Sequence, residues 1–167
     1  MKRIKLDQID CRILSELQTD GRMTNVELAN RAGISAPPCL RRVRALEDAG
    51  YIKGYHAVLA ADKLGYGLMV FAQVSLETHG EADLIKFREH VAILPEVREI
   101  YALTGDFDFL IKIVAKDWDS YQRFLMQNLT SYKGIRHVKS SPCVGVYKNA
   151  PGVPVPEQMG HEDPFRD

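Results

Sequence analysis

Two stretches of the chain combine residue types that can bind a charged partner. The first, GISAPPCLRRVRALEDAG at 33–50, places two adjacent prolines ahead of an arginine pair. Guanidinium groups bind phosphates and the edges of guanine bases, so Arg41 and Arg42 indicate contact with nucleic acid through either of these targets. The alternative is a small helical bundle that binds protein and whose arginines are merely solvated.

The second stretch, TGDFD at 104–108, has the residue types of a loop that binds both a carboxylate and an ammonium group. Gly105 lets backbone N–H groups approach a carboxylate, and Asp106 or Asp108 can pair with an ammonium group. The alternative is an ordinary hairpin turn in which Asp108 bonds to its own backbone. Two carboxylates in a turn do not supply the ligand count of a calcium loop.

No pattern in the sequence indicates an enzyme, a cofactor or a metal site. The sequence has no GxSxG motif, P-loop, dinucleotide-binding glycine pattern or HExxH spacing. The histidines are scattered, at His56, His79, His90, His137 and His161. Cys11, Cys39 and Cys143 lack CxxC spacing, which indicates free thiols in a reducing cytoplasm.

The 167-residue chain has a net charge of zero that conceals an asymmetry. Residues 1–60 carry ten Lys or Arg against seven Asp or Glu, and the remainder carries twelve against fifteen. A basic front half and an acidic back half indicate two modules with different partners. No stretch has the length and apolarity of a transmembrane span, and MKRIKLDQID is not a secretory signal, so we expect no membrane partner and a cytoplasmic location.

Three helices are predicted in the first 50 residues. Apolar residues recur at helical spacing through LDQIDCRILSELQTDGR (6–22). Thr24 and Glu27 have the spacing of a capping box for a short second helix that ends at Gly33. Ser35 is the expected N-cap of a third helix that runs to about residue 49.

The prolines near the start of the third helix are compatible with this reading. Pro37 and Pro38 fall in the first turn, where backbone N–H groups have no intrahelical acceptor, and they stiffen the tip of the helix. A short strand or hairpin is expected at 51–59, which completes a winged helix-turn-helix with its third helix in the major groove of DNA. The residues expected to contact DNA are Arg22, Ser35, Ala36, Pro37, Pro38, Arg41, Arg42 and Lys53.

The second half of the chain alternates between strand and helix patterns. Strands are expected at 68–77, 97–105, 108–115 and 135–148, and helices at 81–94 and 118–132. The order β-α-β-β-α-β is the ferredoxin-like arrangement and makes the chain an α+β protein. Helices on one face of the sheet leave the other face for a partner subunit. The apolar residues assigned to that uncovered face are Val70, Ala72, Val74, Ile111 and Ile113.

These elements give four segments. A winged helix-turn-helix domain is expected at 1–60, a linker at 61–66 and a ferredoxin-like domain at 67–148. The tail at 149–167, NAPGVPVPEQMGHEDPFRD, has four prolines and little apolar content, so we expect it to be flexible.

Two sets of motifs resemble the Lrp/AsnC (feast/famine) family of transcription regulators. The first set is LDQIDCRILSELQTDGRMTNVELANRAGIS with PCLRRVRALEDAGYIKGYHAVL, and the second is TGDFDFLIK. They occur in the family's order and at its spacing, from about Leu6 to Lys148. The resemblance implies a sequence-specific DNA-binding regulator of amino acid metabolism or transport that responds to an amino acid effector. The alternative is an amino-acid-binding or interaction protein that does not regulate transcription.

The same resemblance implies an assembly and an effector site. Family members dimerise through the sheets of their ferredoxin-like (RAM) domains, and dimers often associate into octamers. The effector, leucine or another apolar amino acid, binds between dimers near the loop after the second strand. Trp118 is bulkier than the family pattern and Ser141 replaces an aromatic residue, which leaves open a larger or different apolar amino acid, or no effector. The implied effector residues are Ala102, Thr104, Gly105, Asp106, Phe107, Asp108, Trp118, Ser141, Pro142 and Cys143.

Overall fold

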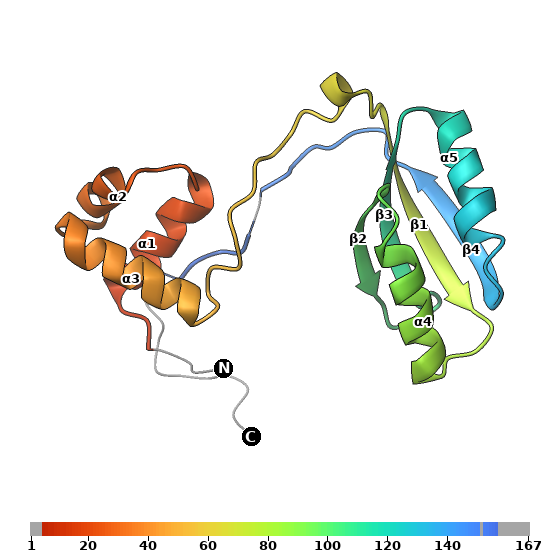
Figure 1. Ribbon diagram of the computed structural model, residues 1–167, viewed down its shortest axis with the longest axis horizontal. Coiled ribbons are helices and arrows are strands. Elements are labelled where there is room, and N and C mark those ends of the chain that lie inside the picture. The colour runs from red at the N-terminus through yellow and green to blue at the C-terminus, as the bar shows by residue number, and fades with distance from the viewer. Residues whose placement is uncertain (1–4, 151, 157–167) are drawn as a thin grey trace. The chain divides into compact units, whose positions relative to one another are not determined.

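The computed structural model describes residues 5–150 and 152–156, which form two compact units (Figure 1). Of the described residues, those up to Val58 together with those from Asn149 onward form the first unit, and Leu59–Lys148 form the second. Each unit has its own buried apolar core and is described by itself. Within the expected tail, Val153 and Val155 contact the first unit.

The first unit contains three short helices, α1 (Gln8–Thr19), α2 (Asn25–Ala32) and α3 (Ala36–Asp48). Each helix buries one apolar stripe against the other two, as the spacing of apolar residues predicts. The buried core of this unit consists of Leu6, Cys11, Ile13, Leu28, Ala29, Ala32, Cys39 and Leu46.

Side chains cap the first two helices. The predicted capping box of α2 is confirmed, because the Thr24 hydroxyl accepts from Glu27 N–H and the Glu27 carboxylate accepts from Thr24 N–H. A second box, which the sequence analysis did not identify, pairs Asp7 with Asp10 at the start of α1. Such boxes satisfy backbone donors that have no partner inside the helix.

The segment after α3 contains no strand. The hairpin expected at 51–59 is therefore not formed, and a short 3-10 helix, Asp62–Leu64, follows. A strand needs a neighbour to accept its backbone hydrogen bonds, and none is supplied within this segment. Tyr55 Oη donates to Glu47 Oε1 (3.0 Å), and burial together with this carboxylate raises the pKa of Tyr55 to about 12.

The second unit has the predicted order β-α-β-β-α-β and forms a four-stranded antiparallel sheet. Its strands are β1 (Leu68–Leu76), β2 (Val97–Ala102), β3 (Phe109–Ala115) and β4 (Ile135–Pro142). Their order across the sheet is β2-β3-β1-β4. The helices are α4 (Glu81–Ala92) and α5 (Trp118–Phe124), the latter extended by a π-helical turn at Leu125–Leu129. This is the ferredoxin-like arrangement.

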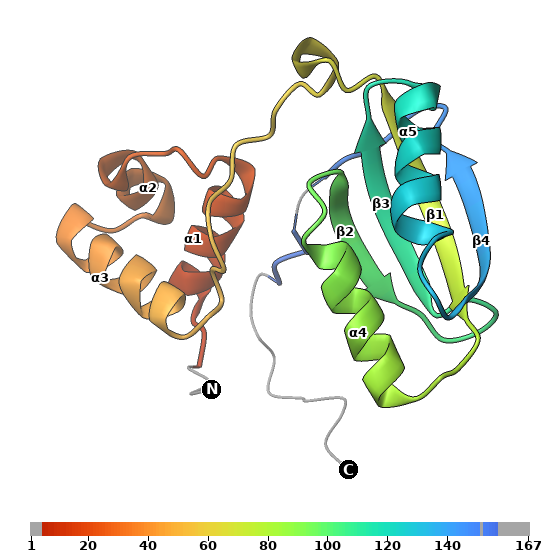
Figure 2. The ribbon, with the colours of Figure 1, turned by 45° about the vertical axis from the view of Figure 1, so that its right-hand side comes forward.

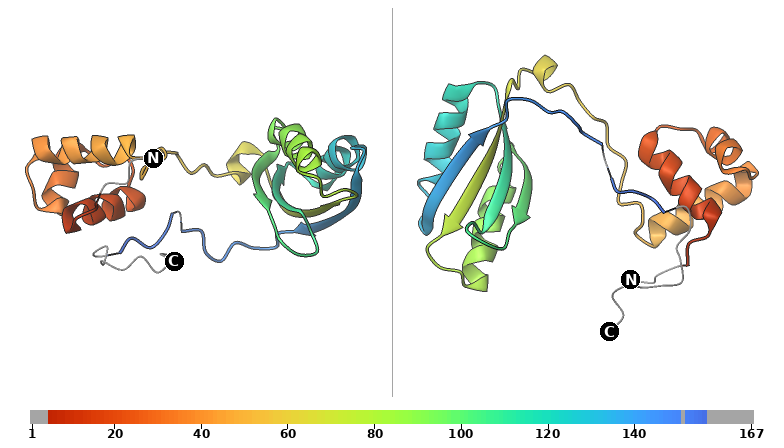
Figure 3. Two further views of the ribbon diagram at one scale, coloured as in Figure 1. Left: turned by 90° about the horizontal axis from the view of Figure 1, so that it is seen from below. Right: turned by 180° about the vertical axis from the view of Figure 1, so that it is seen from behind.

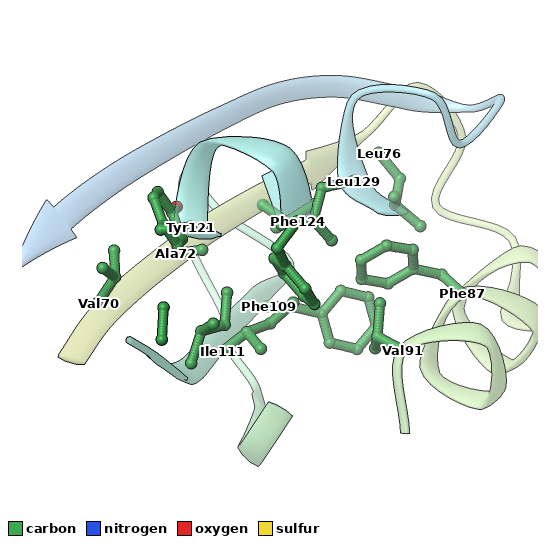
Figure 4. Close-up of a cluster of buried hydrophobic side chains, with 13 residues drawn as sticks. Val70, Ala72, Leu76, Phe87, Val91, Phe109, Ile111, Tyr121, Phe124 and Leu129 are labelled. Atoms are coloured by element: carbon green, nitrogen blue, oxygen red, sulfur yellow. The ribbon is translucent and has the colours of Figure 1, made fainter. Parts of the chain in front are cut away.

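Both helices cover the same face of the sheet (Figures 2 and 3). The expected assignment of faces is wrong, because the strand residues placed on the uncovered face lie in the core beneath the helices, with Phe87 of α4 and Tyr121 of α5 (Figure 4). Those misassigned residues are Val70, Ala72, Val74, Ile111 and Ile113. The period of two separates the faces of a strand but does not say which face the helices cover. The uncovered face instead carries the half-buried residues Phe71, Gln73, Leu110 and Lys112.

Candidate functional site

Helix α3 presents one exposed face on the first unit. Pro37, Arg41 and Arg44 are four and three residues apart, so they lie on the same side of the helix. All three are exposed, whereas Cys39 and Leu46 are buried in the core. In the described part of the chain, no carboxylate forms an ion pair with Arg41 or Arg44. The face therefore combines a rigid tip with two unpaired guanidinium groups.

The turn between α2 and α3 fixes where this face begins. Gly33 ends α2 with φ 74°, a left-handed conformation that favours glycine. Asn25 Nδ2 donates to Ala36 O (2.9 Å), which ties the start of α2 to the start of α3. Ser35 occupies the N-cap position, as predicted, but its side chain makes no capping hydrogen bond. The hydroxyl of Ser35 is exposed at the tip and can contact a partner.

Arg42 differs from its neighbours because it pairs with the start of α1. Its Nη1 lies 2.8 Å from Asp7 Oδ2 and 2.7 Å from Asp10 Oδ1. Burial raises the pKa of Asp7, but hydrogen bonds from Asp10 N–H and from Arg42 outweigh it and hold this pKa below its ordinary value. The hydrogen bond to Asp10, together with that to Asp7, raises the pKa of Arg42. The guanidinium of Arg42 thus joins α3 to α1.

The other residues expected at DNA differ in exposure. Arg22 and Lys53 are exposed and lie outside the helices, where each can reach a phosphate without disturbing the core. Ala36 and Pro38 are half-buried. They shape the tip of α3 and offer no side-chain hydrogen-bond donor to a base.

In the second unit, Asp108 fastens the loop between β2 and β3 to the end of β1. Leu76 N–H donates to Asp108 Oδ2 (2.7 Å), and His79 Nδ1 lies 2.9 Å from Asp108 Oδ1. The side chain of Asp108 is only 18% exposed. Both carboxylate oxygens of Asp108 therefore hold the loop in place. The alternative, in which the side chain of Asp108 bonds to the backbone of its own turn, is not observed.

Asp106 is the loop carboxylate that remains open to a ligand. Its side chain is exposed, while its backbone carbonyl accepts a hydrogen bond from Ser75 Oγ (2.9 Å). Gly105 has φ 119°, which favours glycine, and nothing lies within 4 Å of the position of a Cβ there. Thr104 is also exposed. The loop is held in place by Asp108 and Ser75, and it exposes a carboxylate and backbone groups.

A pocket of about 200 Å³ lies between α4 and the residues that flank this loop. It contains two of the expected effector residues, Ala102 and Asp108, and the charged side chains of Glu81 and Arg88. The sequence analysis did not place α4 beside this loop, because helical periodicity does not indicate which loop a helix faces. Its full lining is Glu81, Leu84, Ile85, Arg88, Ala102, Leu103, Asp108 and Phe109.

Comparison with known proteins accounts for both units. The family model described as winged helix-turn-helix DNA-binding matches residues 6–53, and the one described as Lrp/AsnC ligand binding domain matches residues 69–153. A leucine-responsive regulatory protein of Rhizobium meliloti (strain 1021) is 48% identical over 148 residues, which cover 89% of this chain and 95% of the relative. The chain belongs to the Lrp/AsnC family of transcription regulators.

Two further relatives of this Lrp/AsnC regulator agree with that conclusion. The Bkd operon transcriptional regulator of Pseudomonas aeruginosa is 41% identical over 137 residues, 82% of this chain and 90% of the relative. A solved transcriptional regulator of Neisseria meningitidis, in complex with L-Met, matches with a TM-score of 0.85 at 36% identity, over 89% of this chain and 96% of that chain. The regulator therefore joins a DNA-binding helix-turn-helix to an Lrp/AsnC ligand-binding domain.

Within one copy of the regulator, the expected effector residues lie in two groups, one at each end of β1. At one end, Asp108 N–H donates to Val74 O (2.9 Å). At the other end, Cys143 N–H donates to Met69 O (2.8 Å). Met69 and Val74 are five positions apart along β1, or roughly 17 Å at the rise of an extended strand.

The remaining expected residues follow the same division. Phe107 stays with the loop, because its ring centroid lies 6.2 Å from that of His137 near the start of β4. Trp118 lies near the other end, because its ring is 5.5 Å from that of Tyr121, whose hydroxyl hydrogen-bonds Ser140 next to Ser141. Within one chain, Ala102 lies with the loop at one end of β1, and Trp118 lies with the end of β4 at the other. These two groups of residues do not meet in one chain.

The sequence analysis of the Lrp/AsnC regulator did not assign Arg44 to the exposed face of α3 and did not identify the Asp7–Asp10 pair. The signal for Arg44 was its three-residue spacing from Arg41, and the signal for the pair was its Asp-x-x-Asp spacing before an apolar helix. Among residues 5–150 and 152–156, no group of three or more His, Cys, Asp or Glu is arranged to hold a metal ion. The helices in those same ranges include none with the length and apolar character needed to cross a bilayer.

Proposed function

We propose that this Lrp/AsnC regulator reads double-stranded DNA with the exposed face of α3 and responds to an apolar amino acid at the β2–β3 loop. The observation that carries the DNA contact is the pair of exposed arginines, Arg41 and Arg44, beside the rigid tip at Pro37. Arg22 and Lys53 add phosphate contacts at its flanks, and the Ser35 hydroxyl adds a polar group at the tip. Arg42 supports α3 from behind rather than touching DNA, because Asp7 and Asp10 hold it.

The effector site combines residues from two copies of the chain. The loop supplies backbone groups for the carboxylate of the amino acid and Asp106 for its ammonium group. A second copy supplies Trp118 and the end of β4, because these lie too far from the loop within one chain. Relatives named for leucine, and one solved with L-Met, support an apolar side chain in this site.

The uncovered sheet face forms the dimer contact. Phe71 and Leu110 are half-buried on a face that no helix of this unit covers, and Lys112 is neutralised there by Glu99 (2.8 Å). Two such faces packed together bury apolar area on each copy. Dimers then associate further, to an octamer, to bring the two halves of the effector site together.

The regulator acts in the cytoplasm, without catalysis, by linkage between its two ligands. An effector that binds one state of the assembly more tightly shifts the population toward that state. Because the effector bridges copies, assembly is the quantity that it changes, and assembly sets which α3 helices meet DNA at the same time. The targets are genes of amino acid metabolism or transport.

The DNA contact is tested by fluorescence anisotropy with duplex from the upstream region of the gene. The double variant Arg41→Ala/Arg44→Ala is expected to lose about 1–3 kcal/mol for each arginine that reads a base, or about one unit of salt slope for each that touches a phosphate. Arg31→Ala is the matched control, because Arg31 is paired with Glu16 (3.0 Å). Unchanged affinity in the double variant rejects α3 as the reading helix.

The effector is tested by measuring Tm with each of the twenty amino acids. A ligand that binds only the folded state raises Tm by mass action. A rise with an apolar amino acid that disappears in Asp106→Ala supports the site. A protein that binds an amino acid but never DNA would instead be an amino-acid-binding or interaction protein.

A further inference from the structure

Residues 152–156, near the C-terminus, dock on α1 of the DNA-binding unit. The side-chain amide of Gln18 bonds both backbone groups of Val153: Gln18 Nε2 donates to Val153 O (2.7 Å), and Val153 N–H donates to Gln18 Oε1 (3.0 Å). These residues are 135 positions apart in the chain. A primary amide that pairs with both groups of one residue reproduces the pairing between neighbouring strands.

Gly152 permits this close approach. Its φ of 80° lies in the left-handed region, and a Cβ built there would meet Gln18 Oε1 at 1.9 Å. Any other residue at this position would therefore both strain the backbone and displace the Gln18 amide. The glycine is consistent with a segment shaped to fit α1.

Val155 provides the apolar part of the contact. It packs against the core of the DNA-binding unit, whereas the side chain of Val153 is 68% exposed. Val155 and Pro156 also line a pocket of about 520 Å³, whose other lining residues come from α1, including Ile9 and Arg12, and from the end of α2. The segment thus extends the small core of the first unit over the surface of α1.

The chain between β4 and this segment makes few contacts. Val144 and Tyr147 are 98% and 97% exposed, and residues 143–150 form no helix or strand. The family model for the ligand-binding domain extends across this exposed connection to residue 153. The contacts that the segment makes are with α1 and the core of the first unit.

We propose that residues 152–155, which we name the clasp, are a working part of the DNA-binding unit. The clasp stabilises α1, and α1 positions α3 through the pair of Arg42 with Asp7 and Asp10. When the clasp is released, α1 loosens and α3 binds DNA less tightly. The chain of the ligand-binding unit is then connected to the DNA-binding unit at both of its ends, through residues 59–67 and through the clasp. The DNA part of this inference rests on the proposed function of α3.

The test uses the full-length chain and two matched substitutions in the clasp. Val155→Asp places a charge against the apolar core, and Val153→Asp places the same charge on an exposed side chain two residues away. Hydrogen exchange followed by mass spectrometry reports the opening of α1, and peptides from β1 and β3 serve as internal references. In Val155→Asp we expect α1 amides to exchange about tenfold faster or more, and those of Val153→Asp to exchange as in the parent.

A second pair of variants keeps the test independent of the buried charge. Gly152→Val and Gln18→Ala each remove the amide pairing, and both are expected to accelerate exchange in α1. Anisotropy with duplex DNA should show affinity reduced several-fold in Val155→Asp and unchanged in Val153→Asp. Light scattering should show the same mass for all four variants.

Each result decides a separate point. Unchanged exchange of α1 in both Val155→Asp and Gly152→Val overturns the clasp. Faster exchange of α1 with unchanged DNA affinity overturns its role in DNA recognition. If the parent chain binds no DNA, the proposed function of α3 fails, while the exchange of α1 still tests the clasp.

Discussion

The two units of this regulator organise their sites in different ways. On the first unit, Arg41 and Arg44 share one face of one helix, so a single chain already presents the surface proposed for DNA. On the second unit, the loop containing Asp106 and the aromatic ring of Trp118 lie at opposite ends of β1. Under the proposed function, DNA recognition is encoded locally in one helix, whereas ligand sensing depends on contacts between copies.

We expect the strongest effect from a substitution in the proposed contact between copies. Phe71→Asp places a charge on the uncovered sheet face, and an uncompensated charge buried at a subunit contact costs about 3–5 kcal/mol. Light scattering at several protein concentrations should then give the mass of a monomer. Ile93→Asp, which adds the same charge where the side chain is already 81% exposed, should leave the mass unchanged. An unchanged mass in Phe71→Asp would contradict the dimer contact.

A smaller effect is expected when the two halves of the effector site are damaged on different copies. Asp106→Ala and Trp118→Ala should each weaken effector binding by about 10- to 100-fold, because each removes one side of the site. An equal mixture of the two variants, after subunit exchange, should recover about a quarter of the parent's sites, since random pairing leaves both halves intact in that share. Calorimetry measures the number of sites. No recovery would mean that the site lies within one chain.

The next effect separates two neighbouring arginines. Arg42→Ala leaves Asp7 and Asp10 without their cation, and since Arg42 is 31% exposed we expect a loss of about 1–2 kcal/mol in the free energy of unfolding, less than for a fully buried pair. Arg41→Ala should change this free energy by less than about 0.5 kcal/mol. Denaturant unfolding measures both. Equal losses would show that the pairing does not stabilise the first unit.

The smallest effect is a dependence of stability on pH. The pKa of Asp7 is lower in the folded chain than its ordinary value, so its contribution is complete above about pH 4–5 and is lost as the pH falls through the folded pKa. Because Asp7 is half-exposed, we expect less than about 1 kcal/mol. The difference in unfolding free energy between the parent and Asp7→Asn, followed from pH 6 down to about pH 3, isolates this contribution. A difference that does not change with pH would exclude it.

Local signals in the sequence were sufficient for most of the fold. Thr24 and Glu27 predicted the start of α2, and Gly33 predicted its end, because capping depends on residues that are close in the chain. The strands of the second unit were likewise predicted from alternation. What alternation does not contain is the position of the helices, so Val70 and Ile111 were assigned to the wrong face.

The roles of individual side chains depended on distant partners. Arg41 and Arg42 are adjacent in sequence, but they are about 100° apart around a helix, and only Arg42 faces the acids of α1. In the same way, the role of Asp108 depends on Leu76 N–H at the end of β1. The clasp was not predicted, because nothing in a proline-bearing tail indicates that it binds Gln18, 135 positions away in the chain.

The hydrogen bonds of Asp108 have a consequence for how such sensors diversify. Since Leu76 and His79 hold the loop without a ligand, the residues proposed to contact the ligand need not also support the loop. Thr104, Asp106 and Phe107 can therefore be exchanged for other side chains while the contacts of Asp108 with Leu76 and His79 are kept. A family of proteins with one architecture can in this way acquire different chemical preferences through a few substitutions.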